Sequence, residues 1–340
     1  MIFGAPQKRT GPDGPPPSGK LPNAALMGYG MQWKAVRRPY RLKTIEDTHL
    51  ALVTDPIFVR GMSRSGGTLM VTLLDAHSDI AMSYELYPGL VETDADFDLK
   101  GLAAEIAGAR NHKRVAESAP TKHFSTFVAR SLRGGLSYQD FAELLVQLID
   151  EEHSLAELKG RMRLIELCGL EKMKRVGKTR WGMKCDNAFE DYLTVWPQAC
   201  FLNMLRDGRD VLASQLNTGS FSQTPKEVAK GWQSTIRRFE QLIEHPDAKA
   251  RMVRYEALTE DPEPELRDIC AFLDLPFDPA MLHHQELDLT IFKANHLSKA
   301  RVSSAIDTSM IGRWRKDLNP EQLADFVSIA GEDLTRHGYA

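Results

Sequence analysis

Val59-Arg60-Gly61-Met62-Ser63-Arg64-Ser65-Gly66-Gly67-Thr68-Leu69 is the stretch that decides the fold of this chain. The apolar run Pro56–Val59 at its start suits a short buried strand. The residues Thr68–Leu74 begin a helix that we expect to end near His77. A strand, a glycine-rich turn and a helix in this order predict a phosphate site, because the N–H groups of a helix N-terminus attract anions.

The loop lacks a lysine that nucleotide-triphosphate enzymes use. Gly61 and Gly66 occupy the glycine positions of the pattern G-x-x-x-x-G-K-[ST], and Thr68 occupies its hydroxyl position, but Gly67 stands at the lysine position. That lysine contacts the β- and γ-phosphates, so its absence argues against an ATPase or a kinase. Arg64 and the backbone N–H groups suit a terminal phosphate or sulfate. A serine- and glycine-rich connecting turn is the alternative interpretation of this loop alone.

A second phosphate anchor follows another predicted strand, Ala199–Leu205. Arg206 comes directly after this strand, and Ser214 lies eight residues further on, near the start of the next helix. A guanidinium and a hydroxyl match a phosphate such as one on the ribose of a nucleotide. An ATPase would instead need an acidic residue at this strand end to hold magnesium. The alternative is a surface network of charges from Arg206 to Asp210.

The remaining pattern predicts an α/β fold of the P-loop-like, three-layer type, in which helices flank a central parallel sheet. Residues 86–178 read as a helical insertion that shapes the substrate site. Further signals are a short strand at Met252–Tyr255 and helix starts at Ser137, Thr224, Asp261 and Asn319. We therefore predict a basic, partly disordered arm over residues 1–50 and one catalytic domain over residues 51–340.

Composition narrows the classes of function. The net charge of −3 gives no field that would draw the protein to nucleic acid, and no apolar run approaches the length of a membrane span. Residues 1–45 hold eight Lys and Arg against one acid, Asp13, which indicates a solvated arm or a contact with an acidic partner or a neighbouring subunit. The N-terminus lacks the charged and then apolar layout of a signal peptide, so we expect a cytoplasmic protein. The four cysteines form no C-x-x-C pair, so we expect reduced thiols and no metal site.

Both anchors resemble motifs of the PAPS-dependent sulfotransferases. Residues 59–69 look like the 5′-phosphosulfate loop of that family, and residues 205–214 look like its 3′-phosphate motif. Residues 69–85, 254–262 and 312–314 are similar to the group that contains the tyrosylprotein sulfotransferases and many bacterial relatives. The resemblance covers residues 55–339. It implies a transferase of the EC 2.8.2 type that uses PAPS, releases PAP and needs no metal.

The same resemblance assigns two catalytic residues. Glu85 matches the glutamate that takes the proton of the acceptor hydroxyl, and Lys184 matches the lysine that supports the leaving oxygen. The family usually has a proline within two residues of this lysine, whereas Cys185 and Asp186 follow it here. Lys178 is therefore the alternative catalytic lysine.

Donor binding is assigned to residues from four parts of the chain. The resemblance implies contacts with Arg64, Ser65, Gly66, Gly67, Thr68, Leu69, Arg206, Ser214, Tyr255, Ser303 (or its neighbour Ser304) and Arg313. A core tyrosine is the alternative for Tyr255. Gly67 stands where the family usually has threonine, which implies weaker donor binding or a more mobile loop.

The sequence thus predicts in-line, metal-independent transfer of a sulfuryl group from PAPS to an acceptor hydroxyl on a protein tyrosine, a glycan or a small metabolite. Two alternatives stay open: a nucleotide-dependent kinase with a degenerate loop, and a non-catalytic module that binds PAP. The choice among the acceptors and the formation of a homodimer also stay open.

Overall fold

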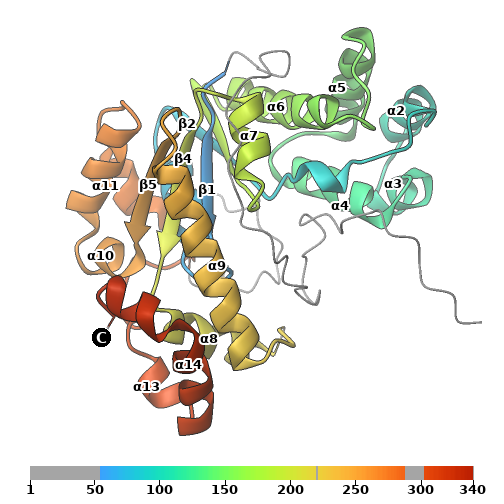
Figure 1. Ribbon diagram of the computed structural model, residues 1–340. Helices are drawn as coiled ribbons and strands as arrows, with labels where there is room; N and C mark the ends of the chain where they lie inside the picture. Colours follow the sequence, from blue (N-terminus) through green and yellow to red (C-terminus); the bar gives the residue numbers. More distant parts are fainter. Residues whose placement is uncertain (1–53, 220, 288–301, 340) are drawn as a thin grey trace, which may run out of the picture.

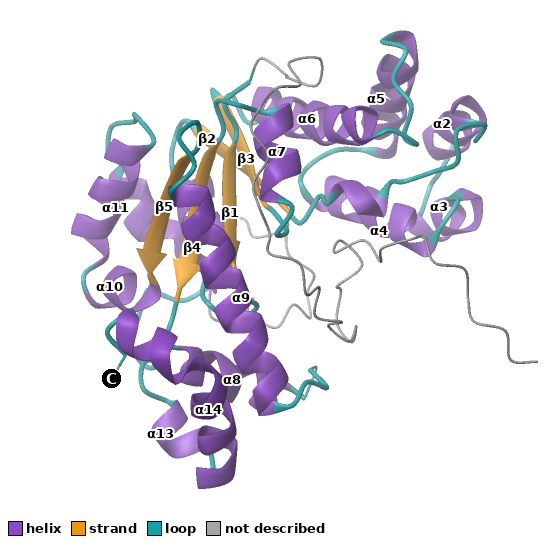
Figure 2. Cartoon of the chain, viewed as in Figure 1, coloured by secondary structure: helices purple, strands orange, loops and turns teal. Residues whose placement is uncertain are grey.

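A five-stranded parallel sheet lies at the centre of the protein (Figures 1 and 2). The computed structural model describes residues 54–219, 221–287 and 302–339, so the predicted arm lies outside the described residues. The strand order is β2-β3-β1-β4-β5. The strands are β1 (Ile57–Gly61), β2 (Ile80–Tyr84), β3 (Arg180–Lys184), β4 (Cys200–Leu205) and β5 (Lys249–Arg254).

Between β2 and β3 the chain forms a run of helices that extends to the right of the sheet in Figure 1. The helices are η3 (Pro88–Leu90), α2 (Leu99–Ala107), α3 (His112–Ser118), α4 (Lys122–Arg133), α5 (Tyr138–Asp150) and α6 (Leu158–Arg175). The Ser137 and Asp140 side chains form the predicted capping box at the start of α5. The helical character predicted for residues 86–178 therefore agrees with the structure.

The other helices complete the layers on both faces of the sheet. They are α1 (Gly67–Ala76), α7 (Phe189–Val195), α8 (Gly208–Thr218), α9 (Pro225–Ile243), α10 (Tyr255–Glu260), α11 (Pro262–Phe272), η4 (Pro279–Glu286), α13 (Trp314–Asp317) and α14 (Pro320–Arg336). The predicted starts near Thr224, Asp261 and Asn319 agree with α9, α11 and α14. Tyr255 opens α10, so the prediction that it lies inside a strand was wrong by one residue.

Successive side chains of β1 point to opposite faces of the sheet, so this strand contributes to two apolar clusters. Ile57 and Val59 belong to the apolar cluster that contains α1 and α11, whereas Phe58 belongs to the cluster that contains the helical insertion. The Phe58 ring contacts Tyr192 and Trp196, with centroid separations of 4.8 and 5.3 Å. Because both faces are covered, the strand reads as the continuous apolar run typical of a parallel sheet. The predicted fold class is thus confirmed.

Two strands, β2 and β3, were not predicted. Gly182 lies in the middle of β3, and a Cβ atom there would lie 2.5 Å from the Ile57 carbonyl oxygen. β1 lies so close to β3 that this position requires glycine. Glycine has a low propensity for strands, so the local sequence did not indicate β3. These strands place the predicted catalytic residues, since Glu85 follows β2 and Lys184 ends β3.

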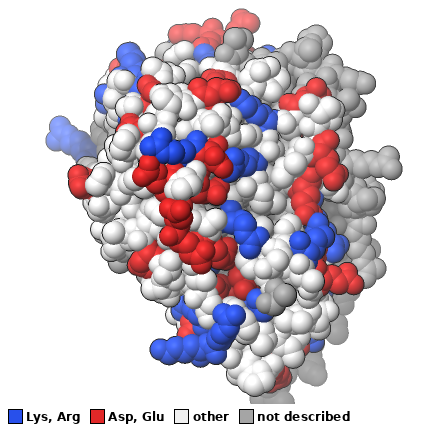
Figure 3. Space-filling view, turned by 90° about the vertical axis from the view of Figure 1, so that its left-hand side faces the viewer, with Lys and Arg blue, Asp and Glu red and all other residues white. Residues whose placement is uncertain are grey.

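Three further observations bear on the class of protein. No helix among the described residues is long and apolar enough to cross a membrane. Acidic and basic side chains lie side by side on the face that carries α10 and α11, as Figure 3 shows. All four cysteines are buried and free of disulfide bonds, as the absence of a C-x-x-C pair predicts.

Candidate active site

The predicted phosphate loop joins β1 to α1 at the carboxyl end of the sheet. The Ser65 N–H donates to the Met62 carbonyl (3.0 Å), and the Met70 N–H donates to the Gly66 carbonyl (3.0 Å), so the turn passes directly into the helix. Ser65 is buried, and Thr68 and Leu69 lie half-buried in the first turn of α1. No acidic residue stands in this turn, which keeps the helix N-terminus favourable for an anion.

Gly66 is required by the backbone and by its neighbour. Its φ is 98°, and a Cβ atom there would meet Cδ2 of Tyr255 at 2.6 Å. Tyr255 is 6% exposed, and its ring faces the Arg206 guanidinium at 4.5 Å. The Tyr255 ring therefore lies against the loop at Gly66 and against the second anchor at Arg206. Its burial also fits the alternative in which Tyr255 is a core residue.

The second anchor is bonded directly to the loop. Arg64 Nε donates to Ser214 Oγ (3.0 Å), and Arg206 Nη1 donates to the Arg64 carbonyl (2.9 Å). Arg206 is 4% exposed, and its Nε has no hydrogen-bond partner among the described residues. The Trp232 indole N–H donates to the Arg206 carbonyl (2.9 Å) and fixes its backbone. The two predicted phosphate sites therefore adjoin each other.

Residues near the C-terminus reach this region through Asp210 in α8. The Asp210 carboxylate accepts hydrogen bonds from the N–H groups of Gly312 (2.8 Å) and Trp314 (3.0 Å). Burial raises the pKa of Asp210, and these two bonds oppose that rise. Between them, Arg313 donates from Nε to Asp317 (2.7 Å) in α13. Arg313 is thus held near the second anchor by its neighbours.

Ser303 and Ser304 lie at the start of the last described segment, and both are exposed. Their predicted role in donor binding stays a prediction. They follow Val302, which is buried in the cluster that contains α1.

Glu85 and Lys184 form an ion pair beside the loop. Lys184 Nζ lies 2.8 Å from Glu85 Oε1, and both side chains are mostly buried. The register pairs Lys184 with Val59 and Tyr84, so the lysine lies between the ends of β1 and β2. A parallel sheet brings the carboxyl ends of neighbouring strands to one edge, and this explains why residues 99 positions apart meet.

The ion pair lies next to the loop at Gly67. A Cβ atom at Gly67 would lie 3.5 Å from Cε of Lys184, which is an ordinary van der Waals contact. The lysine stem therefore passes over the N-terminus of α1. The loop, the cation and the carboxylate are collected at one place, as the sequence predicts for a donor, a leaving oxygen and a base.

Arg130 of α4 belongs to the same cluster and was missed by the sequence analysis. Its Nη2 lies 3.1 Å from Glu85 Oε2, and its Nη1 donates to the Glu85 carbonyl. Its guanidinium also lies 5.6 Å from the centroid of the Tyr87 ring. Arg130 lies in the last turn of α4 with no motif around it, so only the fold reveals this contact.

Lys178 lies at the opposite end of the sheet. Its Nζ donates to the carbonyl of Ile80 (2.9 Å), the first residue of β2, and to the carbonyl of Asp75 in the last turn of α1. Burial lowers the pKa of Lys178, and the charge of Asp75 opposes this. The geometry therefore favours Lys184 as the lysine beside the loop.

The two residues that replace the expected proline are buried. Cys185 is inaccessible, and burial raises the pKa of its thiol. Asp186 accepts a hydrogen bond from the Ala188 N–H (3.1 Å), and burial raises the pKa of its carboxyl. They act as packing and turn residues behind Lys184. In the part of the chain that the structure describes, no group of three or more His, Cys, Asp or Glu could hold a metal ion.

Comparison with curated proteins finds protein-tyrosine sulfotransferases of several animals. A protein-tyrosine sulfotransferase of Drosophila melanogaster is 25% identical over 289 residues, which are 82% of this chain and 48% of that protein. Protein-tyrosine sulfotransferase 1 of Danio rerio is 26% identical over 288 residues, which are 82% of this chain and 68% of that protein. The chain thus spans about half the length of the Drosophila relative.

Solved structures show the same fold. The sulfotransferase domain of the Synechococcus PCC 7002 olefin synthase aligns with a TM-score of 0.53 at 17% identity, over 82% of this chain and 95% of that domain. The sulfotransferase domain of the curacin biosynthetic pathway aligns with a TM-score of 0.51 at 16% identity, over 83% of this chain and 98% of that domain.

A family model places these similarities in one group. The model described as the sulfotransferase family matches residues 56–279, which include all five strands, the loop, Glu85 and Lys184. The predicted resemblance to sulfotransferases of the tyrosylprotein type is thus confirmed. This chain belongs to the sulfotransferase family of transferases.

Proposed function

We propose that this chain transfers a sulfuryl group from PAPS to an acceptor hydroxyl, with Glu85 as the base and Lys184 as the cation beside the leaving oxygen. The observation that carries the proposal is the contact of Lys184 with both Glu85 and the N-terminus of α1, at Gly67. A base, a cation and an anion-binding helix end are the groups that such a transfer needs at one point.

The residues around the loop fit the proposed donor. Arg64, Ser65, the N–H groups of residues 66–69 and the helix end would hold the 5′ end of PAPS, which would supply the sulfuryl group. Arg206 and Ser214 adjoin them and would hold the 3′-phosphate. The buried Nε of Arg206, which lacks a partner among the described residues, supports an anion there.

The ion pair between Lys184 and Glu85 suggests a role for each of these side chains in the transfer. Lys184 neutralises the Glu85 carboxylate while they are paired at 2.8 Å. When Lys184 turns toward the loop, Glu85 loses one neighbouring positive charge and becomes a stronger acceptor of the hydroxyl proton. The proton then goes to Glu85, while Lys184 offsets the charge on the phosphate oxygen that loses the sulfuryl group.

For the acceptor, the names of the relatives differ. The curated relatives are named for protein tyrosine, whereas the solved domains belong to an olefin synthase and to curacin biosynthesis. We propose a hydroxyl acceptor. The cytoplasmic location, the metal-independent mechanism and a homodimer stay predictions.

The test is transfer of labelled sulfate from PAPS to a panel of phenols, peptides, sugars and lipids, combined with calorimetry of PAP binding. We expect the wild type to bind PAP and to transfer sulfate. Glu85→Gln and Lys184→Met should lower kcat by at least about a hundredfold, since each removes a group worth that much in such reactions. PAP affinity should change little for Glu85→Gln.

Lys178→Met is the matched control, because it removes a lysine that lies before β3, at the opposite end of the sheet from Lys184. It should leave kcat unchanged once the folded fraction is accounted for. Magnesium-dependent ATP binding without PAP binding would instead identify a kinase. PAP binding with transfer that survives both catalytic substitutions would show that the assignment of the base and the lysine is wrong.

A further inference from the structure

The turn that follows Lys184 is built from residues that lie inside the protein. Cys185 is inaccessible, and Asp186 and Asn187 are 7% and 5% exposed. Sulfotransferases of this family usually have a proline within two residues of the lysine, and proline restricts the backbone by fixing φ. In this chain the next proline after Lys184 is Pro197. Other contacts therefore hold the turn behind the lysine.

Two consecutive residues of β1 bond this turn. The Cys185 N–H donates to the Val59 carbonyl (2.9 Å), so the pairing of β3 with β1 continues one residue beyond Lys184. Arg60 Nε then donates to Asn187 Oδ1 (2.6 Å), across 127 positions of the sequence. A guanidinium supplied by β1 thus holds the chain three residues after the proposed catalytic lysine.

β1 is a firm support for this hydrogen bond. It pairs with β3 on one side and with β4 on the other, and Phe58 and Val59 are inaccessible. Gly61, the next residue after Arg60, lies so close to β4 that a Cβ atom there would meet the Met204 carbonyl oxygen at 2.8 Å. Side chains on such rigid elements are placed more precisely than side chains on loops. Arg60 therefore offers the turn a fixed point beside the phosphate loop.

Arg60 and Lys184 extend from opposite faces of the sheet. Arg60 shares the face of Phe58, two residues earlier, which belongs to the apolar cluster of the helical insertion. Lys184 pairs in register with Val59, which faces α1, and its stem passes over the N-terminus of that helix at Gly67. The hydrogen bond from Arg60 therefore fixes the backbone after the lysine from the face that the lysine stem does not occupy.

We propose that Arg60 and Asn187 are positioning residues for Lys184, and that their hydrogen bond sets the place of the lysine beside the phosphate loop. This inference rests on the proposed sulfuryl transfer, in which Lys184 offsets the charge on the phosphate oxygen. A cation lowers the barrier only when it is aimed at the atom on which charge develops, so a small displacement slows the reaction. The bond acts on the chemical step and leaves donor binding to the loop and the second anchor.

Removal of either partner tests the proposal. Asn187→Ala and Arg60→Met should each lower kcat about tenfold, because a hydrogen bond from a charged donor is lost and the lysine is displaced. The variant that carries both changes should lose no more than either one alone. The affinity for PAP and KM for PAPS should stay as in the wild type. Transfer of labelled sulfate and calorimetry of PAP measure these quantities.

A cycle with Lys184→Met separates positioning from a general structural role. Asn187→Ala added to Lys184→Met should not lower kcat further, because no ammonium group remains to be positioned. Losses that multiply in the combined variant would show that Asn187 acts independently of the lysine, and the proposal would then be wrong.

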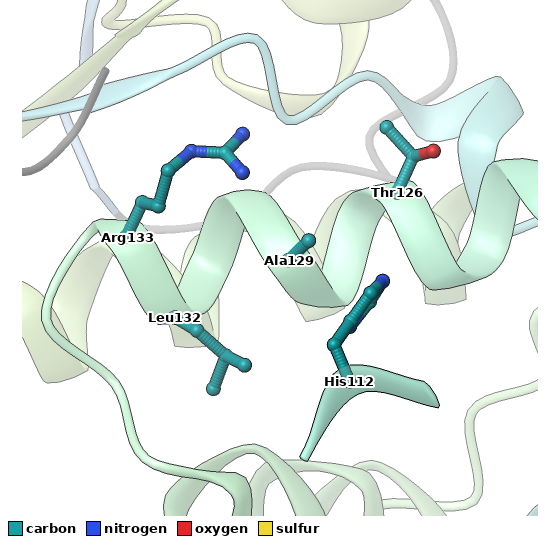
Figure 4. Close-up of a pocket in the computed structure, with 5 residues that line it drawn as sticks. All are labelled: His112, Thr126, Ala129, Leu132 and Arg133. Carbon is teal, nitrogen blue, oxygen red and sulfur yellow. The ribbon is translucent and has the colours of Figure 1, made fainter. Parts of the chain in front are cut away.

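Two variants control for loss of stability. Asn319→Ala also removes an Oδ1 that accepts a hydrogen bond, here from the Gln322 N–H (2.8 Å) at the start of α14. Leu132→Ala enlarges a hollow of about 410 Å³ beside α4, where Leu132 points away from Arg133 (Figure 4). Both should lower the thermal unfolding temperature and leave kcat unchanged. A tenfold fall of kcat in either control would mean that destabilisation alone explains Asn187→Ala, and would overturn the proposal.

NMR of isotope-labelled lysine separates this inference from the proposed function, because it needs no transfer. The Lys184 signal, identified by its loss in Lys184→Met, should move in Asn187→Ala. The signals of Lys172 and Lys178, which bond Asp75 away from the loop, should stay in place. A Lys184 signal that moves, with no transfer to any acceptor, would support the positioning role and count against the proposed function alone. Transfer with a kcat that Asn187→Ala leaves unchanged would retain the function and reject the positioning role.

Discussion

Glu85 adopts a backbone conformation that glutamate normally avoids. Its φ is 55°, and Arg64 in the loop has a φ of 78°. Such residues cost about 1–3 kcal/mol and persist where the surroundings hold them firmly. Arg130 does this for Glu85, because it bonds both the carbonyl and the carboxylate. We therefore regard Arg130 as a positioning residue for the base.

This role predicts the effect of Arg130→Lys. Lysine keeps the charge but lacks the fork that reaches two oxygens at once. We expect kcat to fall about tenfold or more, since loss of a charged hydrogen bond costs about 1.5–3 kcal/mol. KM for PAPS and the affinity for PAP should stay unchanged, as steady-state kinetics and calorimetry would show.

Arg110→Lys serves as the control because Arg110 is an exposed arginine of the same region. It should leave every parameter as in the wild type. An unchanged kcat with a raised KM for the acceptor would mean that Arg130 binds the acceptor instead of positioning Glu85.

Two adjacent glycines offer a matched pair of substitutions. Gly66→Ala places Cβ 2.6 Å from Tyr255 at a φ of 98°, whereas Gly67→Ala makes an ordinary contact of 3.5 Å with Lys184. Gly66→Ala should lower the free energy of unfolding by about 1–3 kcal/mol and weaken PAP binding. Gly67→Ala should do neither, as urea unfolding and calorimetry would show. Equal effects would contradict the geometry of the loop.

At the scale of elements, a forked ion pair joins α6 to Glu151, the residue that directly follows α5. Arg163 in α6 donates from Nε and Nη2 to the two oxygens of Glu151 (2.7 and 2.8 Å). These hydrogen bonds hold the pKa of Glu151 at about 2 instead of 4.5. A depressed pKa in the folded state contributes stability above about pH 4.5, and this is lost as the pH falls toward 2.

Glu151→Gln tests this linkage. The wild type should be more stable than the variant near neutral pH, and the difference should shrink as the pH falls from about 4.5 toward 2. Urea unfolding at a series of pH values measures it. A difference that stays constant with pH would show that the pair does not lower the pKa of Glu151.

Elements with strong local signals were predictable, and those that depend on their neighbours were not. The capping boxes that start with Ser137 and Thr224 each require only four adjacent residues, so the sequence located both helices. β3 depends on Gly182 beneath Ile57, a contact between residues 125 positions apart. Arg130 was missed for the same reason, because its partner lies 45 positions away on another element.

At the scale of the whole molecule, the C-terminal residues lie beyond the region that the family model matches and pack against the sheet and its helices. α14 packs on α9, and Arg254 of β5 donates to the His337 carbonyl (2.6 Å). The Tyr339 hydroxyl donates to Glu256 (2.9 Å), whose pKa is raised by burial. Residues after 301 therefore complete the core on one side of the sheet.

Removal of residues 302–340 should expose the apolar faces of α8 and α9 and should abolish PAP binding. We expect a large drop in the thermal unfolding temperature, because burial of Phe326, Ala330 and Leu334 is lost. Asp210→Asn is a milder variant that weakens the attachment of residues 312–314 and removes the carboxylate charge 3.8 Å from Arg206. A truncated chain that unfolds like the wild type and binds PAP would contradict this account.

The order of the strands has a consequence for divergence and engineering. The helical run leaves the sheet after β2 and returns at β3, its immediate neighbour, while the loop and the second anchor follow β1 and β4. A segment from another protein, inserted between β2 and β3, would need to match only the positions of the two strand ends and to supply a guanidinium that bonds Glu85. Chimeras exchanged at residues 86 and 179 should thus inherit the acceptor of one parent and the nucleotide of the other.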